Sequence, residues 1–218
     1  HELGHQWWGN IVAPYTHNHM WLKEGGAEYS NTLFEEWKNG HEAMVEFIKD
    51  NQQFVLEECH VQDNGFHPLS PMPDDEIYGR HTYYKGASIH HNLRAYLGDE
   101  MYRNACQFVL SEYWDSYMDP DMFIAALEEY SGMDVQTFFD DQVFQPGFST
   151  WVIDSTSTVG GDASGYETTL YLNQKLRACS DFHNNEPIEI YLWYGDWNTS
   201  FEEFRLSGEY DVAVVEHD

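Results

Sequence analysis

Apolar residues recur every three or four positions from the beginning of the chain to about residue 144. This spacing places them along one face of a helix, so the segment is predicted to be helical. In residues 41–59 the core-like positions are Met44, Phe47, Ile48, Val55 and Leu56. The predicted helices cover residues 1–9, 21–37, 41–59, 83–97, 100–113, 121–130 and 134–144. Asp121 and Asp134 are the expected N-caps of the last two, because aspartate accepts hydrogen bonds from free N–H groups there.

After Gly147 the pattern changes to an alternation of apolar and polar residues, which is typical of strands. The predicted strands cover residues 168–172, 188–194, 201–206 and 210–215, with a hairpin loop at residues 195–200. Along one face of the second strand lie Ile188, Ile190, Leu192 and Tyr194. Helices followed by strands indicate an α+β chain of two domains, residues 1–147 and residues 148–218.

Residues 60–80 are predicted to form a long loop. They contain three of the seven prolines and the turn-forming pair Asn64-Gly65. Loops of this length in a compact domain are often functional.

The charge of the chain excludes two classes of partner. Lys and Arg total 10 against 38 Asp and Glu, which gives a formal net charge of -28. Nucleic acids and anionic membrane surfaces are therefore not expected as partners, because both require clustered basic residues. An extracellular or cell-envelope location is slightly favoured over the cytoplasm, since such a surface suits a salty setting. The three cysteines are an odd number, which argues against a disulfide scaffold.

The first five residues form the motif H-E-x-x-H, which is typical of zinc peptidases. On a helix, His1 and His5 lie one turn apart on the same face, so both imidazoles can bind one metal ion. Glu2 would then lie beside the open position of the metal, where it could accept a proton from bound water. Because the chain begins inside this motif and without an initiator Met, we expect it to be a segment of a longer protein.

A catalytic zinc site needs a third protein ligand and leaves the fourth position to water. Glu24, at the beginning of the next predicted helix, could return a carboxylate to the metal. His17 and His19, in the connecting loop, are alternatives.

Three blocks of sequence resemble the zinc aminopeptidases of the aminopeptidase N family, the gluzincin group that also contains leukotriene hydrolase. They are HELGHQWWGN at the start, WLKEG with eighteen residues between His5 and Glu24, and YYKGA from Tyr83. The resemblance implies one Zn²⁺ per chain, held by His1, His5 and Glu24. It also implies a mostly helical, thermolysin-like catalytic domain, of which residues 1–147 are the C-terminal part, followed by a small β-sandwich at residues 148–218.

The resemblance further implies how the residues would act. Glu2 is the expected general base, and Tyr83 is expected to stabilise the transition state, with Tyr84 as the alternative. Glu28 and Asn31 are candidates to accept the outer N–H of a zinc-bound histidine, or are ordinary polar residues of a helix. Tyr78 and Arg80 are further candidates for substrate contact.

The implied function is hydrolysis of N-terminal residues from peptides that have a free amino terminus. A zinc endopeptidase or an epoxide hydrolase on the same scaffold is the enzymatic alternative, and a non-catalytic peptide-binding fragment is the alternative from another class. The family's G-x-M-E-N motif, whose glutamate holds the substrate's amino group, precedes H-E-x-x-H and is not part of this sequence.

Two further motifs carry weaker signals. His90 and His91 are adjacent, and adjacent helical side chains point about 100° apart, so a second metal site there is not expected. Asn198-Thr199-Ser200 matches a glycosylation sequon.

Overall fold

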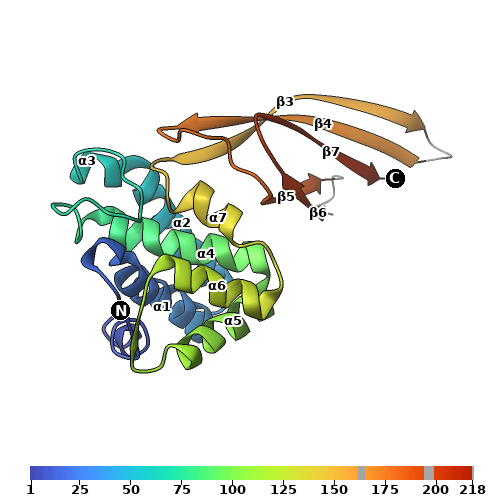
Figure 1. Cartoon of the computed structure of the whole chain (residues 1–218). Coiled ribbons are helices and arrows are strands. Elements are labelled where there is room, and N and C mark those ends of the chain that lie inside the picture. Colours follow the sequence, from blue (N-terminus) through green and yellow to red (C-terminus); the bar gives the residue numbers. More distant parts are fainter. Residues whose placement is uncertain (162–164, 194–198, 218) are drawn as a thin grey trace. The chain divides into compact units, whose positions relative to one another are not determined.

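The computed structural model describes residues 1–161, 165–193 and 199–217. The chain divides into two compact units, His1–Pro146 and Gly147–Asp218. The first contains the helices and the second contains the long strands (Figure 1), so the chain is α+β. Among the described residues, no helix is both long enough and apolar enough to cross a membrane.

Helices dominate the first unit, together with two short strands. The α-helices are α1 (Trp21–Asn39), α2 (His41–Phe54), α3 (His60–Gln62), α4 (Gly86–Leu97), α5 (Asp99–Glu112), α6 (Pro120–Ser131) and α7 (Gln136–Gln142). Shorter turns are the 3₁₀ helices η1 (Gly4–Gln6) and η2 (His17–His19) and the π-helices η3 (Val55–Cys59) and η4 (His81–Lys85). Strands β1 (Val12–Pro14) and β2 (Ser116–Met118) form a parallel pair.

The helix ends follow the turn-forming residues of the sequence. Helix α4 ends at Gly98, whose φ of 87° suits glycine. The predicted N-cap of α6 is wrong by two residues: Asp119, not Asp121, accepts a hydrogen bond from the Met122 N–H. Pro120 takes the first helical position, where its missing N–H costs nothing, so the cap falls one residue before it. Asp134 accepts from the Thr137 N–H in the first turn of α7.

The prediction of a regular helix at residues 1–9 is wrong. Only Gly4–Gln6 is helical, as the 3₁₀ turn η1. After it, the N–H groups of Asn10 and Ile11 each bond to the carbonyl five residues earlier. This wider turn leads the chain directly into β1, which the spacing of apolar residues did not indicate.

The core of the helical unit is built around aromatic rings. Trp21 packs against Phe123 and Phe139, and all three are almost fully buried. Met44 and Ile48 of α2 are buried as predicted, but Phe47 is 37% exposed and Leu56 is 42% exposed. Leu56 lies in the π-helix η3, where Cys59 rather than Leu56 is buried.

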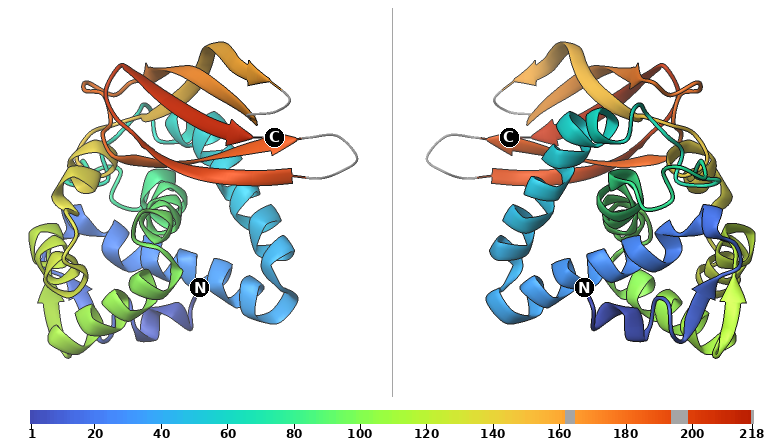
Figure 2. Two further views of the ribbon diagram at one scale, coloured as in Figure 1. Left: turned by 90° about the vertical axis from the view of Figure 1, so that its right-hand side faces the viewer. Right: turned by 90° about the vertical axis from the view of Figure 1, so that its left-hand side faces the viewer.

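The second unit contains two sheets. In one, β4 (Gly165–Arg177) lies between β3 (Phe148–Gly161) and β7 (Tyr210–His217); in the other, β5 (Glu186–Trp193) pairs with β6 (Thr199–Leu206). All pairs are antiparallel. Figure 2 shows the two sheets, whose side chains share one apolar cluster with Leu170 and Val215 from the first and Leu206 from the second. This arrangement has the two layers of a small sandwich.

One long strand escaped prediction. Most residues of β3 are exposed, and its run of Ser and Thr shows no apolar alternation. The predicted face of β5 is confirmed at Ile188, Ile190 and Leu192, which pack against the cluster. Tyr194, most of the predicted hairpin loop at residues 195–200 and the sequon residue Asn198 lie outside the described residues.

Candidate metal centre and active site

Three predicted ligands from two separate segments meet in the helical unit. The Nε2 atoms of His1 and His5 each lie 3.3 Å from Glu24 Oε2. One ligand atom from each residue lies within 4.8 Å of the other two. The two imidazole rings stand nearly perpendicular, with their centroids 4.6 Å apart. The structure therefore gathers His1, His5 and Glu24 into one cluster, even though the first segment is not a regular helix.

Hydrogen bonds on the outer side fix the orientation of both imidazoles. His1 Nδ1 lies 2.8 Å from Glu28 Oε2, and His5 Nδ1 lies 3.0 Å from the carbonyl oxygen of Trp8. A carboxylate and a carbonyl can only accept, so each Nδ1 carries the proton and donates it. The Nε2 lone pair of each ring is consequently free to bind a metal ion.

Asn31 connects Glu28 to the backbone of His1. Its Nδ2 donates to Glu28 Oε1 at 3.3 Å, and its Oδ1 accepts from the backbone nitrogen of His1. Glu28 and Asn31 lie on successive turns of α1, the helix that also carries Glu24. One helix therefore supplies a candidate ligand and the two residues that hold His1 in place.

Lys23 is a contact that sequence reasoning missed. Its Nζ lies 2.7 Å from Glu24 Oε1, while the other carboxylate oxygen faces the histidines. The side chain of Glu24 is only 5% exposed, so this pair offsets part of the cost of burying the carboxylate. Side chains of adjacent helical residues do not usually contact each other, so this pair could not be predicted from the sequence.

The cluster fits zinc. Donor atoms about 2.1 Å from a tetrahedral zinc ion lie about 3.4 Å apart. Each of the two imidazole-to-carboxylate separations is 3.3 Å. Two imidazoles with Nδ1–H groups that have acceptors and one buried carboxylate are also the donor types that zinc prefers.

Glycines allow the supporting segments to approach closely. A Cβ on Gly4 would lie 2.9 Å from the Ser30 side chain, and one on Gly26 would lie 2.7 Å from the Trp8 ring. Because neither glycine has a Cβ, the H-E-x-x-H segment can pack closely against α1. A Cβ on Gly25 would lie 2.8 Å from the Cα of Gly86, so α1 and the beginning of α4 meet at their backbones.

Tyr83 lies beside the cluster on η4. Its ring centroid is 5.9 Å from that of His1. Burial, followed by the charge of Glu24, raises the pKa of Tyr83 to about 12. The phenol therefore stays protonated at neutral pH and can donate a hydrogen bond. The ring of Tyr84 instead packs on Phe54, with a centroid distance of 4.4 Å, so the two adjacent tyrosines face different surroundings.

Asp63, in the predicted long loop, holds the beginning of η4. Its carboxylate accepts from the backbone N–H groups of Arg80 and His81 at 2.8 and 2.7 Å, and lies 2.7 Å from His81 Nδ1. These bonds act as an N-cap for the helix that carries Tyr83. Sequence reasoning missed Asp63, because a cap seventeen residues before its helix leaves no local pattern.

The alternative ligands do not join the cluster. His17 is exposed, and His19 Nδ1 contacts Ser70 Oγ. His90 is a core residue with its Nδ1 3.0 Å from the Tyr102 hydroxyl, and burial lowers the pKa of His90 to about 4. His91 Nδ1 lies 3.3 Å from the Tyr29 hydroxyl.

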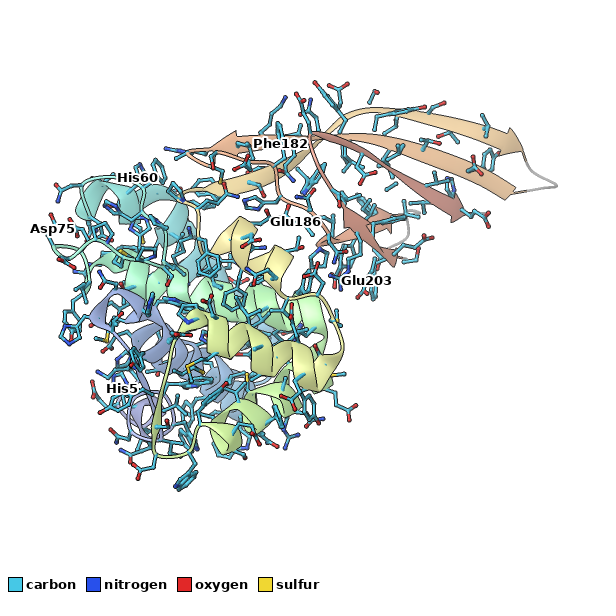
Figure 3. All side chains as sticks on the ribbon, viewed as in Figure 1. His5, His60, Asp75, Phe182, Glu186 and Glu203 are labelled. Atoms are coloured by element: carbon cyan, nitrogen blue, oxygen red, sulfur yellow. The ribbon has the colours of Figure 1, made fainter. Side chains whose placement is uncertain are left out.

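Glu2 is exposed and stands next to a cavity of about 1070 Å³ in the helical unit. His1, Glu2, Trp7 and Tyr29 are among the residues that line it. Figure 3 labels His5 on the same segment. The negative charge of Glu2 makes a small contribution to the raised pKa of Tyr83, so the two side chains interact electrostatically.

Residues 1–142 match the peptidase family M1 domain. The chain belongs to peptidase family M1. This M1 chain is 32% identical over 153 residues to Aminopeptidase M1-B of Oryza sativa subsp. japonica. The aligned region covers 68% of this chain and 17% of that protein. It is 31% identical over 169 residues to Glutamyl aminopeptidase of Bitis rhinoceros, and this alignment covers 73% of this chain and 17% of that protein. The predicted resemblance to this family is confirmed.

The fold also resembles that of a solved aminopeptidase. The crystal structure of Legionella pneumophila aminopeptidase A in complex with aspartic acid covers 99% of this chain with a TM-score of 0.74 and 18% sequence identity. The match covers 24% of that chain. The M1 chain thus spans about a fifth of the length of the proteins it matches, and both of its units have counterparts in the solved fold.

Proposed function

We propose that this chain carries the zinc centre of an M1 metallo-aminopeptidase, with His1, His5 and Glu24 as ligands of one zinc ion. One observation carries the proposal: both Nδ1 atoms have acceptors, and both Nε2 atoms face Glu24 Oε2. Three protein donors with a fourth position left to water make the ligand set of a catalytic zinc site. The relatives, which are named as aminopeptidases, support the same proposal.

The chemistry divides between the metal and the side chains. Zinc, when bound, would lower the pKa of a water molecule and polarise the scissile carbonyl. Glu2 accepts a proton from the attacking water and returns it to the departing amine. Its exposure supports this role, because a base must reach the substrate.

Tyr83 is the proposed donor to the oxygen that gains negative charge in the transition state. Its pKa of about 12 keeps the proton on the phenol throughout the neutral range. A donor already aimed at the reacting centre needs no reorganisation during the reaction. The bonds from Asp63 to the beginning of η4 hold this donor in position.

The proposed substrate is a peptide with a free, protonated amino terminus. The net charge of -28 supports this choice, since a negative field attracts a cationic substrate. The benefit should fall as salt screens the field.

The test uses the protein that carries this sequence, with alanine anilide and its N-acetyl derivative as paired substrates, together with zinc analysis. An aminopeptidase hydrolyses only the free amine and contains one zinc per chain. Equal hydrolysis of the acetylated substrate would favour an endopeptidase instead. Bound zinc with turnover of an epoxide alone would favour an epoxide hydrolase, and loss of both zinc and turnover would favour a peptide-binding module.

A further inference from the structure

A second cluster of reactive groups lies in the β-strand unit, in the loop between β4 and β5. Cys179 Sγ lies 3.6 Å from His183 Nε2, and His183 Nδ1 lies 2.9 Å from Glu186 Oε1. The thiol also lies 3.9 Å from the carbonyl oxygen of Arg177. A nucleophile, a histidine and a carboxylate therefore stand in a row, with the imidazole in contact with both neighbours. Figure 3 labels Glu186 and also Phe182, the residue before His183.

The carboxylate is fixed from several sides. Trp151 Nε1 donates to Glu186 Oε2 at 2.7 Å, and Ser149 Oγ donates to the same carboxylate at 3.1 Å. Gln174 Nε2 lies 3.5 Å from Glu186 Oε2. Glu186 is thereby held towards the imidazole by residues of β3 and β4.

The imidazole is fixed as well. Gln174 accepts from the His183 N–H at 2.7 Å and donates to the His183 carbonyl at 3.1 Å, and Gly208 N–H donates to that carbonyl at 3.0 Å. His183 is only 3% exposed. This is a built arrangement, because a buried ring with a clamped backbone cannot turn away from its two partners.

The charge state follows from the contacts. Burial works to lower the pKa of His183, but the contacts with Cys179 and Glu186 outweigh it and raise the pKa to about 9. The ring is consequently an imidazolium at neutral pH. The His183–Glu186 pair is thus the group that contacts the Cys179 sulfur and could activate it as a nucleophile.

We propose that Cys179, activated by His183 and Glu186, is a site of thiol–disulfide exchange that forms mixed disulfides with small disulfide molecules. The Cys179 thiolate attacks one sulfur of the disulfide, a new S–S bond forms and the original S–S bond breaks. The departing thiolate takes a proton from the His183 imidazolium or from water. No other oxidant is required, since the small disulfide is reduced as Cys179 is oxidised.

Access distinguishes Cys179 from the buried Cys59, whereas Cys106 is half-buried like Cys179. Cys179 lies between two exposed residues, Ala178 and Ser180. Burial raises the pKa of Cys59 and of Cys106 to about 12 each, so these thiols are unreactive in the folded protein. They provide internal controls for labelling.

Charge indicates which small disulfides react fastest. Residues 147–218 contain thirteen Asp and Glu but only three Lys and Arg. A cationic disulfide such as cystamine should therefore react faster than the anionic glutathione disulfide, and added salt should narrow the difference.

The test measures the labelling rate of Cys179 by neutral 2,2′-dithiodipyridine between pH 6 and pH 8, with the site identified by mass spectrometry. For the unchanged protein, the expected rate varies by less than about threefold over this range, whereas an ordinary thiol gains about tenfold per pH unit. A tenfold gain per unit at Cys179 would overturn the proposal. This measurement needs no variant and is therefore independent of any effect on folding.

Two variants test the activating residues. Glu186→Gln keeps a side-chain acceptor for Trp151 but removes the charge, and should lower the rate at pH 6 by about tenfold. Asp181→Asn removes the same charge from the same loop and should leave the rate unchanged. Equal rates in the unchanged protein and in Glu186→Gln would contradict the role of Glu186.

Discussion

Gly25 and Gly86 meet backbone to backbone where α1 passes the beginning of α4, so that a Cβ on Gly25 would lie 2.8 Å from the Cα of Gly86. Gly25 directly follows the candidate ligand Glu24, and Gly86 lies three residues after Tyr83. The contact between the two glycines therefore helps to set how close the candidate metal centre comes to Tyr83, the proposed transition-state donor.

Substitution of Gly86 tests this contact. Gly86→Ala places a Cβ 2.9 Å from the Cα of Gly25, and relief of the clash requires one helix to shift. We expect a loss of about 1–3 kcal/mol in the free energy of unfolding, measured by urea denaturation, together with a lower kcat. Gly161→Ala is the control, because a Cβ there meets nothing within 4 Å. Equal effects of the two substitutions would show that the helix contact is unimportant.

The two adjacent tyrosines form a matched pair for the catalytic role. Tyr83→Phe removes the hydroxyl next to His1 and should lower kcat by about 10²-fold with little change in KM, because the bond forms mainly in the transition state. Tyr84→Phe should leave kcat unchanged, since that ring packs on Phe54. Steady-state kinetics on a free aminoacyl anilide distinguish the two. A larger loss of kcat in Tyr84→Phe would assign the role to Tyr84.

The carboxylate behind His1 should tune zinc affinity. Glu28→Gln weakens the acceptor for His1 Nδ1–H and should raise the Kd for zinc by about 10–100-fold, measured by competition with a fluorescent chelator. Glu35→Gln is the control, because Glu35 is a half-buried residue of the same helix that contacts Asn39. If both variants bind zinc like the unchanged protein, Glu28 is an ordinary surface residue.

Stability of the β-strand unit should fall at high pH because of His183. Its pKa rises from 6.5 to about 9 on folding, so the folded state holds the proton more tightly. This stabilisation is complete below about pH 6.5, is lost as the pH rises through about 9, and amounts to at most about 3 kcal/mol. The free energy of unfolding is measured for His183→Gln and for the unchanged protein at pH 6 and at pH 9.5. The variant should be less stable than the unchanged protein, and this difference should be larger at pH 6 than at pH 9.5. The same gap at both pH values would show that His183 is not charged in the folded state.

The sequence was sufficient to predict the features that repeat with a local period. Helix α1 begins at Trp21 as predicted and ends two residues later than predicted, because its buried residues recur at helical spacing and Gly40 stops it. The apolar face of β5 was equally predictable from alternation. His1 and His5 were predicted as ligands from a motif of five residues, and Glu24 from the resemblance to the aminopeptidase N family.

What could not be predicted depends on contacts between distant segments. The cap from Asp63 to η4 joins residues seventeen and eighteen positions apart, and the Gly25–Gly86 contact joins two helices. Strand β3 has no apolar period because most of it is exposed. The irregular turn at the first five residues arises because η1 packs on α1 through Gly4, and local helix propensity does not include that packing.

Glu2→Gln tests the proposed metal centre and its general base in a single variant. Zinc content and hydrolysis of a free aminoacyl anilide are measured on the same preparation, beside Glu24→Gln. Because Glu2 is not a proposed ligand, Glu2→Gln should retain one zinc per chain while kcat falls by about 10²–10⁴-fold, whereas Glu24→Gln should lose the zinc. Retention of full activity by Glu2→Gln, or of tightly bound zinc by Glu24→Gln, would contradict the account.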